Sequence, residues 1–190
     1  RRFVAGLRAR GMGLIVDVVP NHMGVSRQNA WLWSVLRLGR ASPYAEYFDI
    51  DWEPADAALC GKMLAPYLGD QYGNVLAAGE LSLEWDEASG EYLVAYFDAR
   101  FPLAPECSDE IAANGIEAYD ASRLEGRVRL HALLERQHYR LAWWRSAAEE
   151  INWRRFFEVS DLIGVRVERE DTREAIHRLR RCDRPFASPI

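Results

Sequence analysis

The chain has 190 residues, of which 49% are hydrophobic and 28% charged, a composition typical of a globular protein with a sizeable core and not of a disordered chain. Its 24 basic and 29 acidic side chains give a net charge of −5, which argues against binding to nucleic acid or to an anionic membrane surface. No apolar run approaches the roughly 20 residues of a membrane helix and no signal segment opens the chain, so the sequence favours a cytoplasmic location.

The cysteines and the two ends of the chain add two expectations. The three cysteines are scattered and lack a CxxC spacing, so they support neither a disulfide framework nor a zinc site. The chain starts with Arg1-Arg2-Phe3, already inside a predicted helix, and ends in the unpatterned RRCDRPFASPI. Both ends favour a piece of a longer protein, although a cleaved leader or a trimmed start also explains the first residue.

The first 24 residues predict a helix, a turn and a strand. Phe3, Val4 and Leu7 share one helical face, and Gly11 stands where a helix end favours a residue with positive φ. The run 14–19 is rich in β-branched residues and is interrupted only by Asp17, as in a strand buried on both faces of a parallel sheet. Together these elements predict part of an α/β unit.

The middle of the chain predicts a helix, an ordered loop and a β-hairpin in turn. Residues 26–39 predict a helix with Ser26 as N-cap and Gly39 as its end. The aromatic and acidic run 42–54 has no regular period and predicts an ordered loop. Between residues 81 and 97, alternating LSLEW, the turn DEASG and EYLVAYF predict a β-hairpin.

The last third is predicted to be mainly helical. Residues 121–151 predict a helical region broken near Gln137 to Tyr139, and a short strand at 164–168 precedes a helix that starts near Asp171. Nearly 140 residues therefore separate the first predicted strand from the strand at Val165. Excursions of this length between the strands of an α/β fold are usually functional subdomains.

Polar side chains follow the first predicted strand at its carboxyl end, where parallel α/β folds place their sites. Asp17 is expected to face the interior, where a carboxylate orients its neighbours, while the turn at Pro20 carries Asn21 and His22 over the mouth. An imidazole there can donate a hydrogen bond to a sugar hydroxyl. The alternative is that Asp17 caps a local turn and His22 is an ordinary surface histidine.

The segment DVVPNH at 17–22 resembles the first signature of the alpha-amylase superfamily of glycoside hydrolases, at the end of barrel strand three. The resemblance becomes more specific further along. The segments LGDQYGNVLAAGELSLEWDEASGEYLVAYFDARFPLAP and QHYRLAWWRSAAEEINWRRFFEVSDLIGVRVE are similar to the characteristic insert and following segment of maltooligosyltrehalose synthases. Amylases in general lack similarity to these stretches.

This resemblance implies an intramolecular transglucosylation that converts the reducing-end α-1,4 linkage of a maltooligosaccharide to an α,α-1,1 linkage. It implies a retaining mechanism with two carboxylates about 5 Å apart. His22 would contact the glucose at the cleaved bond, Asn21 would support the loop, and Asp17 would orient substrate. Related amylases bind calcium with the equivalent of Asn21, but no nearby cluster of oxygen ligands supports calcium here.

One motif invites a wrong assignment. Arg166 and Glu168 have the spacing of the Arg and nucleophilic Asp of the superfamily, but Glu is one methylene longer, and in the family this segment precedes the helix before the nucleophile strand. The resemblance fades within a few residues after VERED at 167–171. We therefore expect no catalytic residue in this chain.

Several other groups have both a functional and a plainer interpretation. Tryptophans can stack on sugars, but in a mixed domain they more often lie in the core or at interfaces; these are Trp143, Trp144 and Trp153. Arg154 and Arg155, beside Phe156 and Phe157, could reach a substrate hydroxyl, although a salt-bridged solvent face is the plainer account. The acids from Asp49 to Asp56 show no metal-ligand spacing.

The expected fold class is α/β: a partial (β/α)8 barrel, from the region of its third strand, with a large mixed α+β insertion. Residues 1–24 would hold the barrel helix and strand three, 25–158 the insertion with the hairpin near 81–97, and 159–190 the approach to the next barrel strand. The expected site is His22, Asn21 and Asp17 facing a maltooligosaccharide or α-1,4-glucan, without metal or cofactor. An amylase-like α-glucan hydrolase and a non-catalytic glucan-binding remnant remain alternatives.

Overall fold

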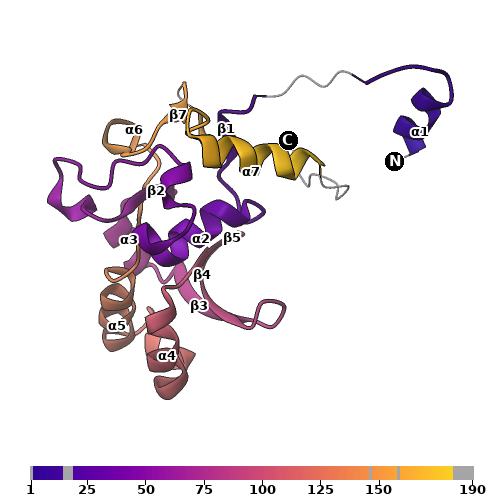
Figure 1. Cartoon of the computed structure of the whole chain (residues 1–190). Helices are drawn as coiled ribbons and strands as arrows, with labels where there is room; N and C mark the ends of the chain where they lie inside the picture. The colour runs from indigo at the N-terminus through magenta and orange to yellow at the C-terminus, as the bar shows by residue number, and fades with distance from the viewer. Residues whose placement is uncertain (1, 15–18, 146, 158, 182–190) are drawn as a thin grey trace.

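The computed structural model describes residues 2–14, 19–145, 147–157 and 159–181. In these ranges short helices surround three small sheets (Figure 1). The α-helices are α1 (Arg2–Arg8), α2 (Ala30–Leu38), α3 (Tyr72–Ala77), α4 (Ser108–Asn114), α5 (Leu124–Leu134), α6 (Ala147–Glu150) and α7 (Glu170–Arg181). Short 3-10 turns are η1 (Gly39–Ala41), η2 (Ala45–Tyr47), η3 (Ala57–Leu59), η4 (Pro105–Cys107) and η5 (Ile116–Tyr119).

The three sheets differ in topology. An antiparallel sheet has the order β1-β8-β7, from β1 (His22–Gly24), β8 (Val159–Gly164) and β7 (Arg155–Phe156). A parallel pair joins β2 (Met63–Leu68) to β6 (Tyr139–Trp143). An antiparallel meander runs through β3 (Leu81–Asp86), β4 (Glu91–Tyr96) and β5 (Ala99–Pro102). The mixed α/β class is thus confirmed.

One apolar cluster connects the three sheets. Its buried members include Ile163 of β8, Leu68 of β2, Val94 of β4 and Tyr139 of β6. Phe48, in the aromatic and acidic run 42–54 that is called the aromatic loop below, is fully buried and bridges to Val165 just after β8. The segment predicted as an ordered loop is therefore part of the core, and it connects the sheet around His22 to the rest of the molecule. No helix in the described ranges is long and apolar enough to cross a bilayer.

The N-terminal helix forms as predicted, and its end explains why Gly11 is needed. Gly11 N–H donates to Arg8 O and Met12 N–H to Leu7 O, both at 3.0 Å, and Gly11 has φ of +67°. This is the hydrogen-bond pattern of a Schellman end. No residue of α1 is buried, and the helix lies apart from the sheets (Figure 1).

The structure describes only the two ends of the buried strand that was predicted at 14–19. Residues 15–18 lie outside the described residues. Leu14 and Val19 are exposed and belong to no strand. The first strand that the structure describes, β1, begins later, at His22.

The second helix has the predicted end but a different start. Gly39 follows α2 with φ of +56°, and its N–H donates to Val35 O. The N-cap is Asn29, whose Oδ1 accepts from Leu32 N at 3.2 Å, so the prediction of Ser26 was wrong. Ser26 instead closes a turn in which its carbonyl accepts from Asn29 N. An amide oxygen caps a helix as well as a hydroxyl does, and Asn29 stands next to the first helical residue.

Two further predictions need correction. The region 121–151 is helical only in α5 and α6; the break near 137–139 is real, but it leads into the strand β6 and not into more helix. The strand predicted at 164–168 lies earlier, as β8, and pairs antiparallel with β1. The hairpin near 81–97 is confirmed as β3 and β4, with β5 as an additional strand, and the helix expected from Asp171 is α7.

Candidate functional site

The strand β1 fixes the position of His22. Its partner is β8, with His22 opposite Gly164, and Val165 N–H donates to the carbonyl of Asn21 at 2.8 Å. Because Pro20 and Asn21 form a turn immediately before the strand, the Asn21 side chain lies beside the His22 ring. The structure therefore brings together two of the three residues predicted to bind substrate, while Asp17 lies outside the described residues.

The imidazole of His22 has a defined environment. Nδ1 lies 3.1 Å from Oδ1 of Asn21. Since an amide oxygen only accepts, a ring with its proton on Nδ1 fits this contact. No hydrogen bond of normal geometry reaches the buried Nε2 from the described residues. The ring also packs edge-on against Phe156, with centroids 4.9 Å apart and planes at 77°.

The protonation state of His22 follows from these surroundings. Burial lowers the pKa of His22 below its usual value of 6.5, and the positive charge of Arg154 lowers it further, while the main chain of Arg155 acts in the opposite direction. The imidazole is therefore neutral at pH 7. A neutral ring with a protonated Nδ1 accepts a hydrogen bond at Nε2. The expected hydrogen bond between His22 and a sugar hydroxyl stays a prediction.

This lowered pKa predicts how His22 affects stability with pH. Protons bind more readily to the unfolded chain, so the stability that His22 contributes is complete above pH 6.5 and is lost as the pH falls toward the pKa of the folded state. NMR titration should give a midpoint for His22 below 6.5. His22→Gln should remove this part of the acid destabilisation, and an equal pH dependence of unfolding in the two proteins would contradict the assignment.

A short aromatic hairpin lies over His22. It comprises Phe156 of β7 and Phe157, before β8 begins at Val159. The Phe157 side chain is 83% exposed, its φ is +55°, and its ring packs edge-on against Phe156 with centroids 4.8 Å apart. A non-glycine residue in this conformation indicates that the surroundings hold the turn. His22, Asn21, Phe156 and Phe157 are called the His22 wall below.

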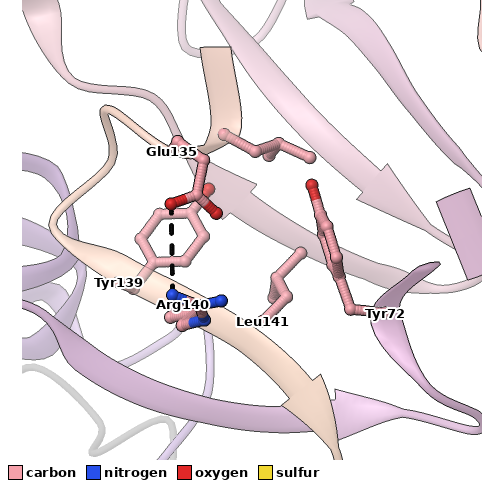
Figure 2. Close-up of a pocket in the computed structure, with 6 residues that line it drawn as sticks. Tyr72, Glu135, Tyr139, Arg140 and Leu141 are labelled. Atoms are coloured by element: carbon pink, nitrogen blue, oxygen red, sulfur yellow. Dashed lines mark ion pairs between the residues drawn. The ribbon is translucent and has the colours of Figure 1, made fainter. Parts of the chain in front are cut away.

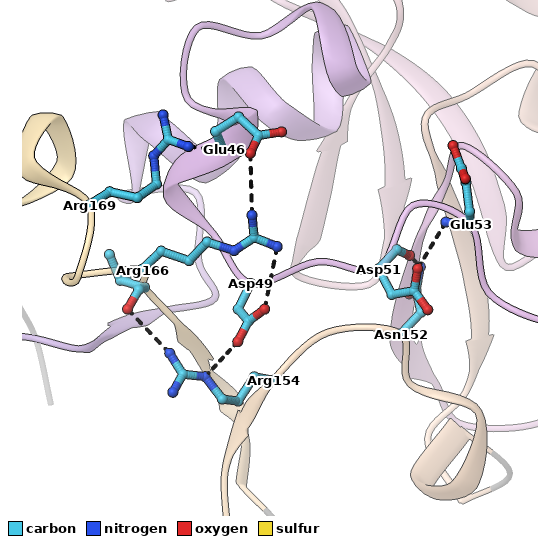
Figure 3. Close-up of polar contacts among 9 residues, drawn as sticks. Glu46, Asp49, Asp51, Glu53, Asn152, Arg154, Arg166 and Arg169 are labelled. Carbon is cyan, nitrogen blue, oxygen red and sulfur yellow. Dashed lines mark hydrogen bonds and ion pairs between the residues drawn. The ribbon is translucent and has the colours of Figure 1, made fainter.

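A network of charged side chains connects Asp49 and Glu46 to Arg154, Arg166 and Arg169 (Figure 3). Asp49 accepts from Arg154 at 2.9 Å and from Arg166 at 3.5 Å, and Arg166 also pairs with Glu46 at 3.2 Å. Glu46 is in turn 3.6 Å from Arg169. The salt-bridged interpretation of Arg154 is therefore confirmed.

Arg166 and Glu168, which have the spacing of the nucleophile motif, have other surroundings than such a motif needs. Arg166 pairs with Glu46 and Asp49, and Glu168 is exposed in the turn before α7. A nucleophile needs a fixed carboxylate at a substrate cleft.

The remaining acids of the aromatic loop have structural partners. Asp51 Oδ1 accepts from Glu53 N at 3.0 Å, and Asp56 Oδ1 accepts from Ala58 N at 2.9 Å, so both carboxylates close local turns. Among the described residues no group of three or more His, Cys, Asp or Glu side chains is arranged to hold a metal ion.

The tryptophans divide between core and surface. Trp153 is buried and its Nε1 donates to Leu64 O at 2.8 Å, which supports the core interpretation. Trp144 is 55% exposed, and the guanidinium of Arg145 lies 5.1 Å from its ring centroid. Sequence reasoning gave no means of separating these two residues, because each is followed by an arginine and the local pattern does not indicate which ring the fold covers.

A small pocket lies between α5 and β6, apart from the His22 wall (Figure 2). Its volume of about 10 Å³ is that of one water position and is far too small for a glucose ring. It is lined by Tyr72, Leu134, Glu135, Tyr139, Arg140 and Leu141. Burial raises the pKa of Tyr72 to about 12, and its hydroxyl lies 3.0 Å from Nδ1 of His131. This pocket is therefore part of the packing and is no candidate for glucan binding.

Comparison with known proteins gives one consistent result. A protein of Mycobacterium tuberculosis assigned as a maltooligosyl trehalose synthase, with the same figures in the CDC 1551 and H37Rv strains, is 38% identical over 178 residues, or 93% of this chain. A maltooligosyltrehalose synthase structure from Arthrobacter ramosus is 35% identical over 92% of the chain, with a TM-score of 0.65. A glycosyltrehalose synthase structure, DSM5389, covers 94% at 30% identity and a TM-score of 0.75.

The matches cover nearly all of this chain but only a small part of each relative. The chain spans about 19% of the length of the curated relatives, and 19% and 22% of the two solved structures. No protein-family model matches the chain. The resemblance to maltooligosyltrehalose synthases seen in the sequence is confirmed by these relatives, over nearly the whole of this chain and about a fifth of theirs.

Proposed function

We propose, from the premise that this chain is related over nearly all its length to maltooligosyl trehalose synthases, that it forms a glucan-binding part of such an enzyme. The reaction would be the intramolecular transfer that converts the reducing-end α-1,4 linkage of a maltooligosaccharide to an α,α-1,1 linkage. This activity belongs to the glucosylmutases, which are isomerases of the alpha-amylase superfamily. The observation that supports the proposal is the His22 wall, which lies in a chain that is similar to maltooligosyl trehalose synthases over nearly all its length.

The His22 wall has the groups that a sugar site uses. Nε2 of the neutral His22 would accept from a glucosyl hydroxyl, and Asn21 holds the ring through Nδ1. The exposed face of Phe157 would stack on the apolar face of a sugar ring, as aromatic side chains do in such sites. Nε2 is buried in the free chain, so binding requires the aromatic hairpin to shift or a hydroxyl to enter beside it. Asp17 would orient substrate next to this wall.

The fold proposed for the parent enzyme places this wall at a barrel mouth. Residues 1–24 would be the helix and third strand of a (β/α)8 barrel, residues 25–158 the insertion, and residues 159–190 the approach to the next strand. A mixed α+β insertion is supported by the parallel pair of β2 and β6 and the antiparallel meander of β3, β4 and β5, which lie between β1 and β8 in the chain. In such barrels the loops at the carboxyl ends of the strands build the active site.

The chemistry itself would need more than this chain offers. A retaining transfer uses one carboxylate as nucleophile and a second as acid and base. Asp49 is paired with Arg154 and Arg166, and Glu168 stands exposed in a turn. We therefore infer that the isolated chain turns over no glucan, and that catalysis needs carboxylates from elsewhere in a longer protein.

Turnover with maltopentaose separates the proposal from its alternatives. A longer protein that contains this segment should remove reducing ends without shortening the sugar; release of short sugars would instead indicate an amylase-like hydrolase. The isolated chain should bind maltopentaose and leave both the reducing ends and the chain length unchanged. Binding by the segment without turnover in any longer protein would favour a glucan-binding remnant.

The binding role of His22 predicts a specific loss. His22→Ala should weaken maltopentaose binding to the 190-residue chain about tenfold or more, because it removes an acceptor and the ring that supports Phe156. Titration calorimetry measures the effect. His177→Ala, on the exposed side of α7, is the matched control and should bind as the unchanged chain does. Equal affinity of the two variants would contradict the site.

A further inference from the structure

Arg154 lies at the junction of three segments that are far apart in the sequence. Its N–H donates to Asp49 O at 2.9 Å, and its carbonyl accepts from Gly164 N at 2.7 Å. Asp49 N–H in turn donates to Gly164 O at 3.0 Å. These three main-chain hydrogen bonds join the aromatic loop, the residue before β7 and the end of β8.

The side chain of Arg154 also joins the aromatic loop to the end of β8. Its Nε is 2.9 Å from Oδ2 of Asp49, and its Nη2 donates to Val165 O at 3.3 Å (Figure 3). The guanidinium crosses β8 at Gly164, where a Cβ atom would lie 2.6 Å from Nε of Arg154. The absence of a side chain at position 164 is therefore what lets the arginine lie flat on the strand.

The aromatic hairpin starts directly after this junction. Arg155 and Phe156 form β7, whose pairing with β8 changes register between these two residues. Phe156 follows Arg154 by two residues in the sequence, and its ring packs against His22. Gly164 lies opposite His22 across the sheet. Arg154 thus holds the base of the hairpin and the strand opposite His22 at once.

We propose that Arg154 is a positioning residue for the His22 wall: through Asp49 and the Val165 carbonyl it sets where Phe156 lies against His22. The proposal deepens the proposed function and rests on it for the meaning of the wall, although the geometry can be tested without any sugar. Lysine cannot replace arginine here, because a single ammonium does not span a carboxylate and a carbonyl in the way that a planar guanidinium does.

Two variants separate the effect of the guanidinium geometry of Arg154 from the effect of its charge. Arg154→Lys keeps the charge, and Arg154→Gln removes it. In both variants the NMR signals of the His22 ring should move and its nuclear Overhauser contacts to Phe156 should weaken. The pKa of His22 should rise more in Arg154→Gln than in Arg154→Lys, because both variants reduce the burial of the ring but only Arg154→Gln also removes the charge that lowers the pKa. Arg178→Gln, which breaks an exposed pair with Glu174 on α7, is the control.

Binding gives the functional result. Arg154→Lys should bind maltopentaose about fivefold to tenfold more weakly, as expected when an aromatic contact is misplaced. Unchanged His22–Phe156 contacts in Arg154→Lys, even in a variant that melts earlier, would overturn the proposal and leave Arg154 a general stabilising residue. If a variant of Arg154 fails to fold, Asp49→Asn removes the same ion pair and should shift the same signals. A chain that binds no maltopentaose contradicts the proposed function alone, since the ring contacts and the pKa still decide the role of Arg154.

Discussion

Replacing Gly126 with alanine is expected to lower the free energy of unfolding by about 3 kcal/mol, the upper part of the range for overpacking a buried site. This result reverses the usual rule that alanine stabilises the interior of a helix relative to glycine. Gly126 is buried in the first turn of α5, where the main chain of Asp120 crosses the helix. A Cβ atom at position 126 would overlap the Asp120 carbonyl oxygen and lie 2.8 Å from its nitrogen.

The matched control is a helical glycine with open space around it. Gly73 lies in α3, and no heavy atom comes within 4 Å of the position of an added Cβ. Gly73→Ala should therefore raise the free energy of unfolding by about 0.5 to 1 kcal/mol. Urea denaturation of the two variants measures both changes. A stabilising Gly126→Ala would show that the Asp120 segment moves aside at little cost, which contradicts close packing there.

Replacing Asn152 with alanine is expected to cost about 3 kcal/mol or more, because it leaves buried main-chain groups without partners. Oδ1 of Asn152 accepts from Leu64 N at 2.9 Å, and Nδ2 donates to Asp51 O at 2.7 Å and to Lys62 O at 2.8 Å. The side chain is the bridge between the aromatic loop, β2 and the segment before β7. Its loss should reduce stability and also loosen the network around Asp49.

An asparagine on the surface provides the comparison. Asn114, at the exposed end of α4, donates to Glu110 O at 2.8 Å and also makes a side-chain hydrogen bond with Tyr119. Asn114→Ala should change the free energy of unfolding by less than about 1 kcal/mol, since water reaches these groups and replaces the bonds. Chemical denaturation gives both values. Similar costs for Asn114→Ala and Asn152→Ala would mean that the buried groups around position 152 find other partners.

The elements that sequence patterns predicted best are those whose stability is local. The hairpin of β3 and β4 combines alternation with a turn, and the helix ends at Gly11 and Gly39 need a positive φ that glycine adopts easily. The N-cap of α2 was misplaced by three residues, because serine and asparagine both cap helices and only packing decides between them.

The strand β6 was missed for a non-local reason. Residues 139–143 follow a helix and carry apolar side chains at spacings that fit either a helix or a buried strand. They form a strand because β2 lies alongside, with Met63 opposite Tyr139. Nothing in the local sequence around Tyr139 records a partner more than seventy residues earlier, so tertiary structure overrides the local pattern here.

The candidate site was predictable in part. The motif indicated Asn21 and His22, and the structure places their side chains together. It did not indicate Phe156 as the ring against His22, nor the pairing of Asp49 with Arg154 across about a hundred residues. These contacts arise from strand pairing between distant segments, which a single sequence does not encode in any short pattern.

The pairing of β1 with β8 has a consequence for the order of folding. His22 and Gly164 face each other across about 140 residues of intervening chain, and closing a loop of that length is entropically unfavourable until the intervening elements have become compact. The hairpin and the helices can form from near neighbours long before that closure. The His22 wall is therefore a late product of folding, and a destabilised variant would lose the wall before it loses its local elements.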